Sequence, residues 1–146
     1  GEGAKKRALL DMQARENIDN VIMCPVQPKA RMPAYYQASD ICLVNLRDVQ
    51  LFQSFIPSKM FEIMACGVPI IGAVRGEARE ILVRSGSARL VEPGDAVALA
   101  EAIQWSQAHS ETRKQMGVAG RSFVSAYYDR RVLAKRYEMM LAEVVT

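Results

Sequence analysis

The residues with the clearest chemical potential lie in a short predicted helix that begins at Ser58. At about 100° of rotation per residue, Ser58, Lys59 and Glu62 leave its first turns on one side. A hydroxyl, free backbone N–H groups and an ammonium at a helix N-terminus suit phosphate. The carboxylate one turn deeper would repel phosphate but would accept two hydroxyl hydrogens, as a ribose diol offers. The combination therefore indicates a nucleoside diphosphate.

The same spacing also has a purely structural interpretation. Ser58 would cap the helix, Lys59 would be solvated, and Glu62 would pair with that lysine. The spacing alone leaves both interpretations open.

Short apolar runs alternate along the chain with segments of helical periodicity. Strands are predicted at 21–24, 41–46, 68–74 and 89–91, and helices at 4–17, 33–39, 58–66, 77–85, 96–108, 110–126 and 130–144. Strands that are apolar throughout are covered on both faces, and their alternation with helices implies right-handed βαβ units. The predicted fold class is α/β, with a doubly wound, Rossmann-like parallel sheet flanked by helices and extra C-terminal helices.

Three residues predict where helices begin and end: Gly67 and Gly86 as stops, and Asp95 as an N-cap. The last predicted helix carries a one-sided apolar stripe, formed by Leu133, Tyr137, Met140, Leu141 and Val144.

Ligands of such sheets bind beyond the carboxyl ends of the strands, which selects the loops after Leu46, Val74 and Val91. The first loop is long, and long loops inside compact domains are often functional. The second places Gly76 and Glu77 at a helix start, where backbone amides would touch sugar or phosphate. A favourable interaction with the helix dipole explains Glu77 equally well.

Composition limits the classes of function. The chain has 146 residues, half of them apolar and 24% charged, which is typical of a folded globular domain. Its net charge of +3 is too small to require nucleic acid or an anionic membrane as a partner. Cys24, Cys42 and Cys66 lack a C-x-x-C pairing, so neither a zinc site nor a disulfide framework is predicted. We expect buried thiols in a reducing cytoplasm.

Residues 62–71 (Glu-Ile-Met-Ala-Cys-Gly-Val-Pro-Ile-Ile) resemble the E-A-M-A-x-G-x-P-V-V signature of the family-four, or group 1, glycosyltransferases. Further pieces resemble other motifs of that family in the same order: 1–3 its G-x-G turn, 20–22 its N-V-x-F strand, 38–41 its A-A-D-V, and 90–103 its V-x-P-G-D…A-L-A-x-A-I. The resemblance covers nearly the whole chain and implies the C-terminal, donor-binding half of a GT-B fold.

One position departs from the family pattern. The usual E-x7-E pair would place its first Glu at Ser54. Residues 57–62 instead resemble the P-S-K-x-x-E variant of members that build bacterial surface polysaccharides. The resemblance implies that Glu62 binds the nucleotide ribose and that Ser58 and Lys59 bind the diphosphate, with Lys59 placed to stabilise the leaving group. Whether Gln53, Ser54 or backbone amides replace the first Glu stays open.

By this resemblance, residues 1–146 form a single Rossmann-like domain, the C-terminal part of a larger two-domain enzyme, without the first strands of the domain. The enzyme would be a retaining glycosyltransferase that uses a nucleotide-sugar donor, a UDP-sugar first among them, and no metal or other cofactor. The acceptor would be a glycan or a lipid-linked glycan bound by a missing N-terminal domain. A cytoplasmic enzyme, with peripheral contact of that domain with the inner face of the membrane, is a further expectation.

Two alternatives belong to other classes. A non-catalytic, receiver-like module would need an acidic cluster after its first strand and a late lysine, and neither pattern is present. A sugar-nucleotide epimerase of the same fold would share the donor contacts but would need acid/base carboxylates in its cleft.

Overall fold

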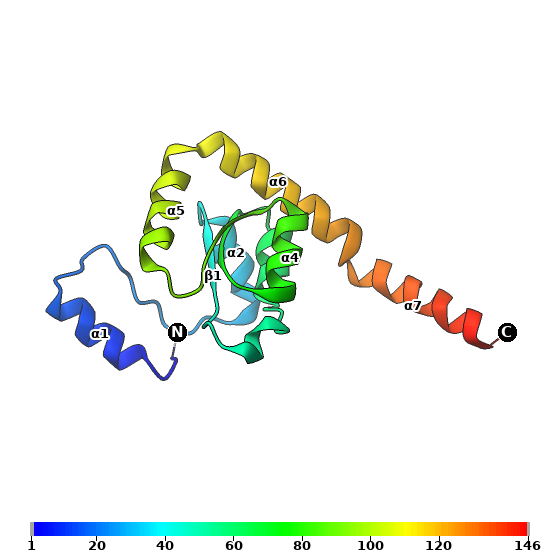
Figure 1. Cartoon of the computed structure of the whole chain (residues 1–146), viewed down its shortest axis with the longest axis horizontal. Coiled ribbons are helices and arrows are strands. Elements are labelled where there is room, and N and C mark those ends of the chain that lie inside the picture. The colour runs from blue at the N-terminus through cyan, green and yellow to red at the C-terminus, as the bar shows by residue number, and fades with distance from the viewer. Residues whose placement is uncertain (1, 146) are drawn as a thin grey trace. The chain divides into compact units, whose positions relative to one another are not determined.

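The computed structural model describes residues 2–145, and side chains as far as residue 143. It divides into two units, Gly1–Met32 and Pro33–Thr146 (Figure 1). Gly1, part of the expected G-x-G turn, and the side chain of Val144, part of the predicted stripe, lie outside the described residues. The expectation of one domain over the whole chain stays a prediction, and each unit is described by itself.

The described part of the first unit contains the helix α1 (Lys6–Arg15), as predicted, and a 3-10 turn at Lys29–Arg31, just before α2. The strand predicted at 21–24 is wrong, because these residues adopt no regular structure and join no ladder. A strand needs a hydrogen-bonded neighbour. The described residues of this unit contain no strand with which residues 21–24 could pair. The Gln13 side-chain amide donates to the carbonyls of Ile18 and Val21 instead, at 3.1 and 2.6 Å.

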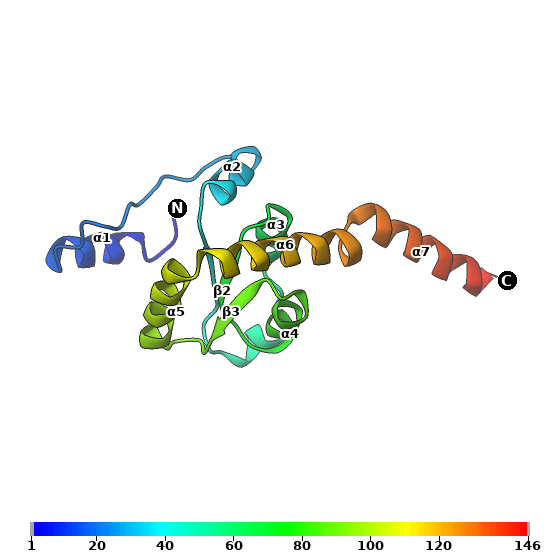
Figure 2. The ribbon, with the colours of Figure 1, turned by 90° about the horizontal axis from the view of Figure 1, so that it is seen from above.

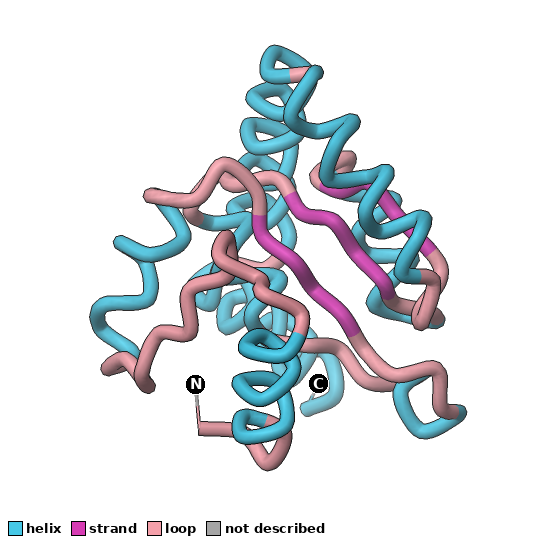
Figure 3. The backbone as a smooth tube through the Cα atoms, turned by 90° about the vertical axis from the view of Figure 1, so that its left-hand side faces the viewer, coloured by secondary structure: helices cyan, strands magenta, loops and turns pink. Residues whose placement is uncertain are grey.

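The second unit is built on a three-stranded parallel sheet. The strands are β1 (Cys42–Asn45), β2 (Ile70–Ala73) and β3 (Ala88–Val91), in the order β1-β2-β3 (Figure 3). Since all three strands run the same way, the loops that follow them leave from one edge of the sheet. That edge is the predicted place for a ligand.

The residues that the structure describes form six α-helices besides α1: α2 (Met32–Gln37), α3 (Lys59–Ala65), α4 (Gly76–Ser85), α5 (Ala96–Ala108), α6 (Ser110–Tyr127) and α7 (Arg130–Val145). Figures 1 and 2 show α5 and α4 on opposite sides of the strands. The α6 helix packs against both α3 and α4. Helices on both faces of a parallel sheet confirm the predicted doubly wound α/β class.

The hydrophobic core has two parts, one on each face of the sheet. The larger part joins Ile70 to residues of α3, α4 and α6, and the smaller joins Ile71 and Ala73 to α5. The whole of β2 is buried, as predicted. In β1, however, Leu43 and Asn45 are exposed, because α5 packs against β2 and β3. The expectation that every strand is covered on both faces is therefore wrong for β1.

The predicted helix ends are confirmed. Gly67 and Gly86 adopt positive φ angles of 73° and 62° just after α3 and α4, a conformation that costs glycine little. Asp95 caps α5, with its carboxylate accepting a hydrogen bond from the Ala98 N–H at 2.9 Å.

The two C-terminal helices differ in how closely they are held. The α6 helix approaches the α3–β2 turn so tightly that a Cβ at Gly117 would collide with the Gly67 carbonyl oxygen. By contrast, the described members of the α7 stripe are exposed: Leu133, Tyr137, Met140 and Leu141. Among the described helices, none has both the length and the apolar composition needed to cross a membrane.

The prediction that all three cysteines are buried is wrong. Cys24 is exposed and Cys42 and Cys66 are half-buried. Cys24 lies in the segment that was expected to be a strand and forms none.

Candidate functional site

The packing of α3 decides which side chains it presents. Met60, Ile63 and Met64 are buried against the sheet and α6. Because the side chains of a helix are distributed at about 100° per residue, Ser58 and Glu62 leave on another side. Ser58 is exposed and Glu62 is half-buried, so the core residues of α3 aim the predicted ligands outward.

The carboxylate of Glu62 has a partner from a distant part of the chain. The Tyr36 hydroxyl, at the end of α2, donates a hydrogen bond to Glu62 Oε2 at 3.4 Å. Partial burial, together with the charge of Glu62, raises the pKa of Tyr36 above its usual value. The tyrosine therefore stays a hydrogen-bond donor at neutral pH. Because its bond engages only Oε2, the other carboxylate oxygen of Glu62 is left for a ligand.

Ser58 and Glu62 line a common cavity of about 520 Å³ between α3, the end of α6 and the start of α7. Phe61 and Tyr128 form part of its wall, with their ring centroids 4.6 Å apart. Ligand pockets of this size, mostly apolar with a few converging polar groups, accept drug-sized molecules. The structure thus brings two of the predicted site residues together beside an aromatic wall.

Lys59 points elsewhere. Its ammonium donates to the carbonyl oxygen of Leu43 on β1 at 3.2 Å, and partial desolvation lowers the pKa of Lys59 from its usual value. No ion pair between described residues joins Lys59 to Glu62, and the Ser58 side chain makes no capping hydrogen bond. The arrangement expected from the purely structural interpretation is therefore not present.

The loop between β1 and α3 packs against the start of α4. It contains a 3-10 turn, Gln50–Gln53, followed by Ser54, which is exposed. Gly76 has a φ of +59°, and a Cβ there would collide with the Gln53 carbonyl oxygen. Glu77, next along α4, is exposed. The structure brings Gly76 against the predicted loop, while no hydrogen bond or ion pair between described residues links Ser54 or Glu77 to Glu62.

Charged residues outside the predicted site connect three loops at the same edge. Arg75 follows β2, and its Nη2 lies 3.2 Å from a carboxylate oxygen of Asp48, which follows β1. The same nitrogen lies 3.2 Å from Glu92, which follows β3. The signal in the sequence was a charged residue just after each of three successive strands.

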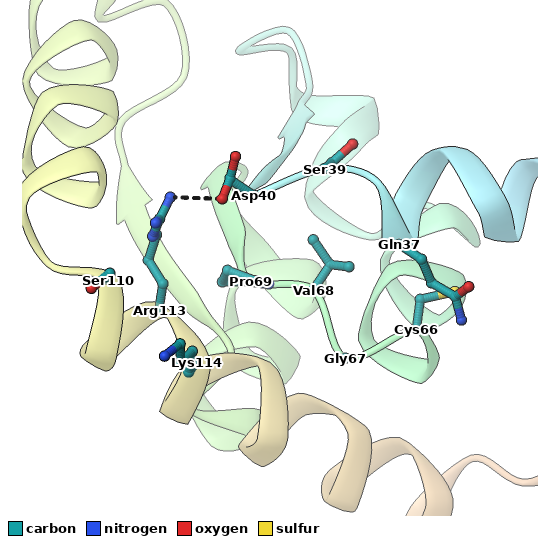
Figure 4. A pocket seen from close by; sticks show the side chains of 10 residues that line it. All are labelled: Gln37, Ser39, Asp40, Cys66, Gly67, Val68, Pro69, Ser110, Arg113 and Lys114. Carbon is teal, nitrogen blue, oxygen red and sulfur yellow. Dashed lines mark ion pairs between the residues drawn. The ribbon is translucent and has the colours of Figure 1, made fainter.

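A second cavity, of about 250 Å³, lies at the opposite edge of the sheet. Figure 4 shows Arg113 reaching from α6 to Asp40, just before β1, at 3.5 Å. Since ligands of doubly wound sheets bind at the other edge, we assign this cavity no role. It marks where α6 is tied to the start of the sheet.

No group of three or more His, Cys, Asp or Glu side chains in residues 2–143 is arranged to hold a metal ion.

The sequence profile described as "Glycosyl transferases group 1" matches residues 1–123. The chain belongs to this family. The match includes α3, the loop before it and the start of α4, so every site residue predicted from the sequence lies inside the family domain.

Solved structures show the same fold. Sucrose-phosphate synthase from Thermosynechococcus elongatus has 26% sequence identity and a TM-score of 0.78, over 99% of this chain and 35% of its own. HepE from Anabaena, in complex with UDP-glucose, has 18% identity and a TM-score of 0.80, over 98% of this chain and 38% of its own. The C-terminal domain of LpcC, a group 1 glycosyl transferase from Francisella tularensis, has 21% identity and a TM-score of 0.67, over 86% of this chain and 63% of its own.

The glycosyltransferase chain thus has the fold of the C-terminal half of GT-B, as the motifs predict. It spans little more than a third of the first two relatives and less than two thirds of the third. No curated protein sequence matches it significantly.

Proposed function

We propose that this group 1 glycosyltransferase domain binds the nucleotide-sugar donor of a retaining glycosyltransferase, a UDP-sugar first among the candidates. The observation that carries the proposal is the Glu62 carboxylate, which faces a cavity together with Ser58 and is held by the Tyr36 hydroxyl. Family membership supports it, as does the UDP-glucose bound by HepE, a protein of the same fold.

Each candidate residue has a role in this proposal. Glu62 accepts hydrogen bonds from the ribose diol, and the aromatic wall of the cavity offers a surface to the nucleoside. Ser58 donates to the diphosphate. Lys59, once its ammonium leaves the carbonyl oxygen of Leu43, stabilises the negative charge that develops on the diphosphate as the sugar leaves. The sugar then lies toward Ser54 of the β1–α3 loop and toward Gly76 and Glu77 at the start of α4, at the same edge of the sheet.

We place residues 1–146 in the C-terminal part of a two-domain bacterial enzyme of surface polysaccharide biosynthesis. A glycan or lipid-linked acceptor would be bound by an N-terminal domain, which would contact the inner face of the membrane from the cytoplasm. Because transfer needs donor and acceptor held together in one cleft, we expect this chain to bind nucleotide weakly and to transfer no sugar by itself.

Titration calorimetry of the chain with UDP, GDP and ADP tests the proposal. We expect binding of at least one nucleotide, lost in Lys59→Ala and in Glu62→Ala, and unchanged in Glu101→Ala, an exposed carboxylate on α5. The unmodified chain should bind UDP more tightly than 2′-deoxy-UDP, because the deoxy sugar offers the Glu62 carboxylate no diol to recognise.

Backbone chemical-shift mapping with the same nucleotides locates the site. Shifts concentrated at residues 58–62 support the proposal. Saturable binding that leaves those residues unperturbed, or an unchanged affinity in both alanine variants, would contradict it.

A further inference from the structure

Arg75 belongs to the connection between β2 and α4, and its side chain contacts the connections that follow β1 and β3. It directly precedes α4, and its guanidinium lies between Asp48 of the first loop and Glu92 of the third, with Nη2 3.2 Å from each carboxylate. Each of the three side chains is about half exposed, at 45, 50 and 56%. An isolated exposed ion pair stabilises a protein by about 0–1 kcal/mol. These two pairs therefore add little to the stability of the fold, and their main effect is on the position of the loops that they join.

The next residue holds the same loop by a different contact. Gly76 approaches the carbonyl of Gln53 so closely that only a residue without a Cβ fits. The 3-10 turn Gln50–Gln53 is therefore fastened on both sides: Asp48 before it by the charge of Arg75, and Gln53 at its end by the backbone at Gly76. Between these contacts the side chains pack with a void of only about 10 Å³.

We propose that Arg75 is a positioning residue for the donor site, one that fixes the β1–α3 loop and so sets where Ser54 and the start of α3 lie. The effect on donor binding rests on the proposed function. The ordering of the loop by Arg75 does not, and it can be measured without a nucleotide. Ser54 directly follows the fastened turn, and the loop leads without interruption into Ser58. If Asp48 were released from the guanidinium, the first half of the loop could move. The positions of Ser54 and Ser58 would then be less well defined.

Arg75→Met removes both ion pairs and keeps the apolar stem, and Asp48→Asn removes only the link to the loop. Arg79→Met is the matched control, since Arg79 lies on α4 one turn after Arg75 and also approaches Glu92, at 3.5 Å, but forms no ion pair with the described part of the β1–α3 loop. Arg75→Lys keeps the charge and should restore most of the loop's order.

The direct measurement is amide hydrogen exchange in the 146-residue chain. We expect residues 48–55 to exchange at least threefold faster in Arg75→Met and in Asp48→Asn, with β2 and α6 unchanged. Exchange in Arg79→Met and Arg75→Lys should stay close to that of the unmodified chain. Unchanged exchange at 48–55 in Arg75→Met overturns the proposal, as does equal acceleration in Arg79→Met.

Calorimetry with UDP then separates this inference from the proposed function. If the unmodified chain binds UDP, affinity should fall severalfold in Arg75→Met and Asp48→Asn but not in Arg79→Met, and an unchanged affinity counts against a positioning role. If the unmodified chain binds no nucleotide, the proposed function fails, while the exchange measurement still decides whether Arg75 orders the loop.

Discussion

The Tyr36 hydroxyl and the Glu62 carboxylate, 26 positions apart in the chain, are joined by a hydrogen bond of 3.4 Å. It fixes one carboxylate oxygen of a residue whose backbone is already fixed by α3. A preorganised acceptor spends less conformational entropy when a ligand binds.

We therefore predict that Tyr36→Phe weakens UDP binding about two- to tenfold, the range expected for the loss of one hydrogen bond worth about 0.5–1.5 kcal/mol. Calorimetry measures the change. Tyr35→Phe is the control, because Tyr35 is exposed and its hydroxyl makes no hydrogen bond to the site. Equal losses in the two variants would show that the Tyr36–Glu62 bond has no special importance.

The three cysteines should differ in their reaction with iodoacetamide. Cys24 is exposed and should be modified first. Burial raises the pKa of both Cys42 and Cys66, and the charge of Glu62 adds to the effect at Cys66. Since only the thiolate reacts, modification of these two should be slow at pH 8 and should accelerate further above pH 9. Mass spectrometry of timed digests gives the order.

A variant at Glu62 tests the cause of the raised pKa of Cys66, with Cys42 as the control. In Glu62→Gln, the pKa of Cys66 should move down toward its usual value, and Cys66 should react faster, while Cys42 keeps its rate. A rate at Cys66 that does not respond to Glu62 would contradict the electrostatic contact between the two side chains.

Asp129 should titrate far into the acid range. Hydrogen bonds from the Arg131 side chain and backbone lower the pKa of Asp129 from 3.8 to about 2. Its carboxylate is more acidic in the folded chain than in the unfolded chain, so the stability it contributes is present above pH 3.8 and is lost as the pH falls toward 2. Carboxyl-carbon chemical shifts should give a midpoint near 2, and Arg131→Gln should move that midpoint upward.

Gly117→Ala should destabilise the chain. Alanine favours a helix over glycine by about 1 kcal/mol, but its Cβ would collide with the Gly67 carbonyl, and such overpacking costs about 1–3 kcal/mol. We expect a lower melting temperature by calorimetry. Val118→Ala, at an exposed position of the same helix, should leave it nearly unchanged, and a stabilised Gly117→Ala would show that the contact with the α3–β2 turn yields easily.

The sequence predicts local features that short-range chemistry determines, and it fails where distant parts meet. Gly86 and Asp95 act at helix ends through their own backbone and side-chain geometry, so their roles were readable. The run at 21–24 is apolar enough for a strand, but a strand depends on a neighbour that no local pattern reveals. Leu43 is exposed for a similar reason, since the position of α5 over β2 and β3 follows from tertiary packing.

The candidate site divides in the same way. Helical periodicity placed Ser58 and Glu62 on one side of α3, and they do face a common cavity. It did not show that Lys59 would turn to the carbonyl of Leu43 or that Tyr36 would reach Glu62, because both contacts come from other elements. The contacts of Arg75 are not visible in any local pattern, because its two partners lie 27 and 17 positions away along the chain.

The glycines of α6 carry an implication for the order of folding. Gly117 and Gly120 both lie against other elements of the sheet unit, and each weakens the helix by about 1 kcal/mol relative to alanine when the segment is alone in water. Packing against the α3–β2 turn therefore has to offset what these two glycines cost the helix. We expect α6 to fold only after α3 and β2 have met, which makes the last helix of the family domain the last to become stable during synthesis.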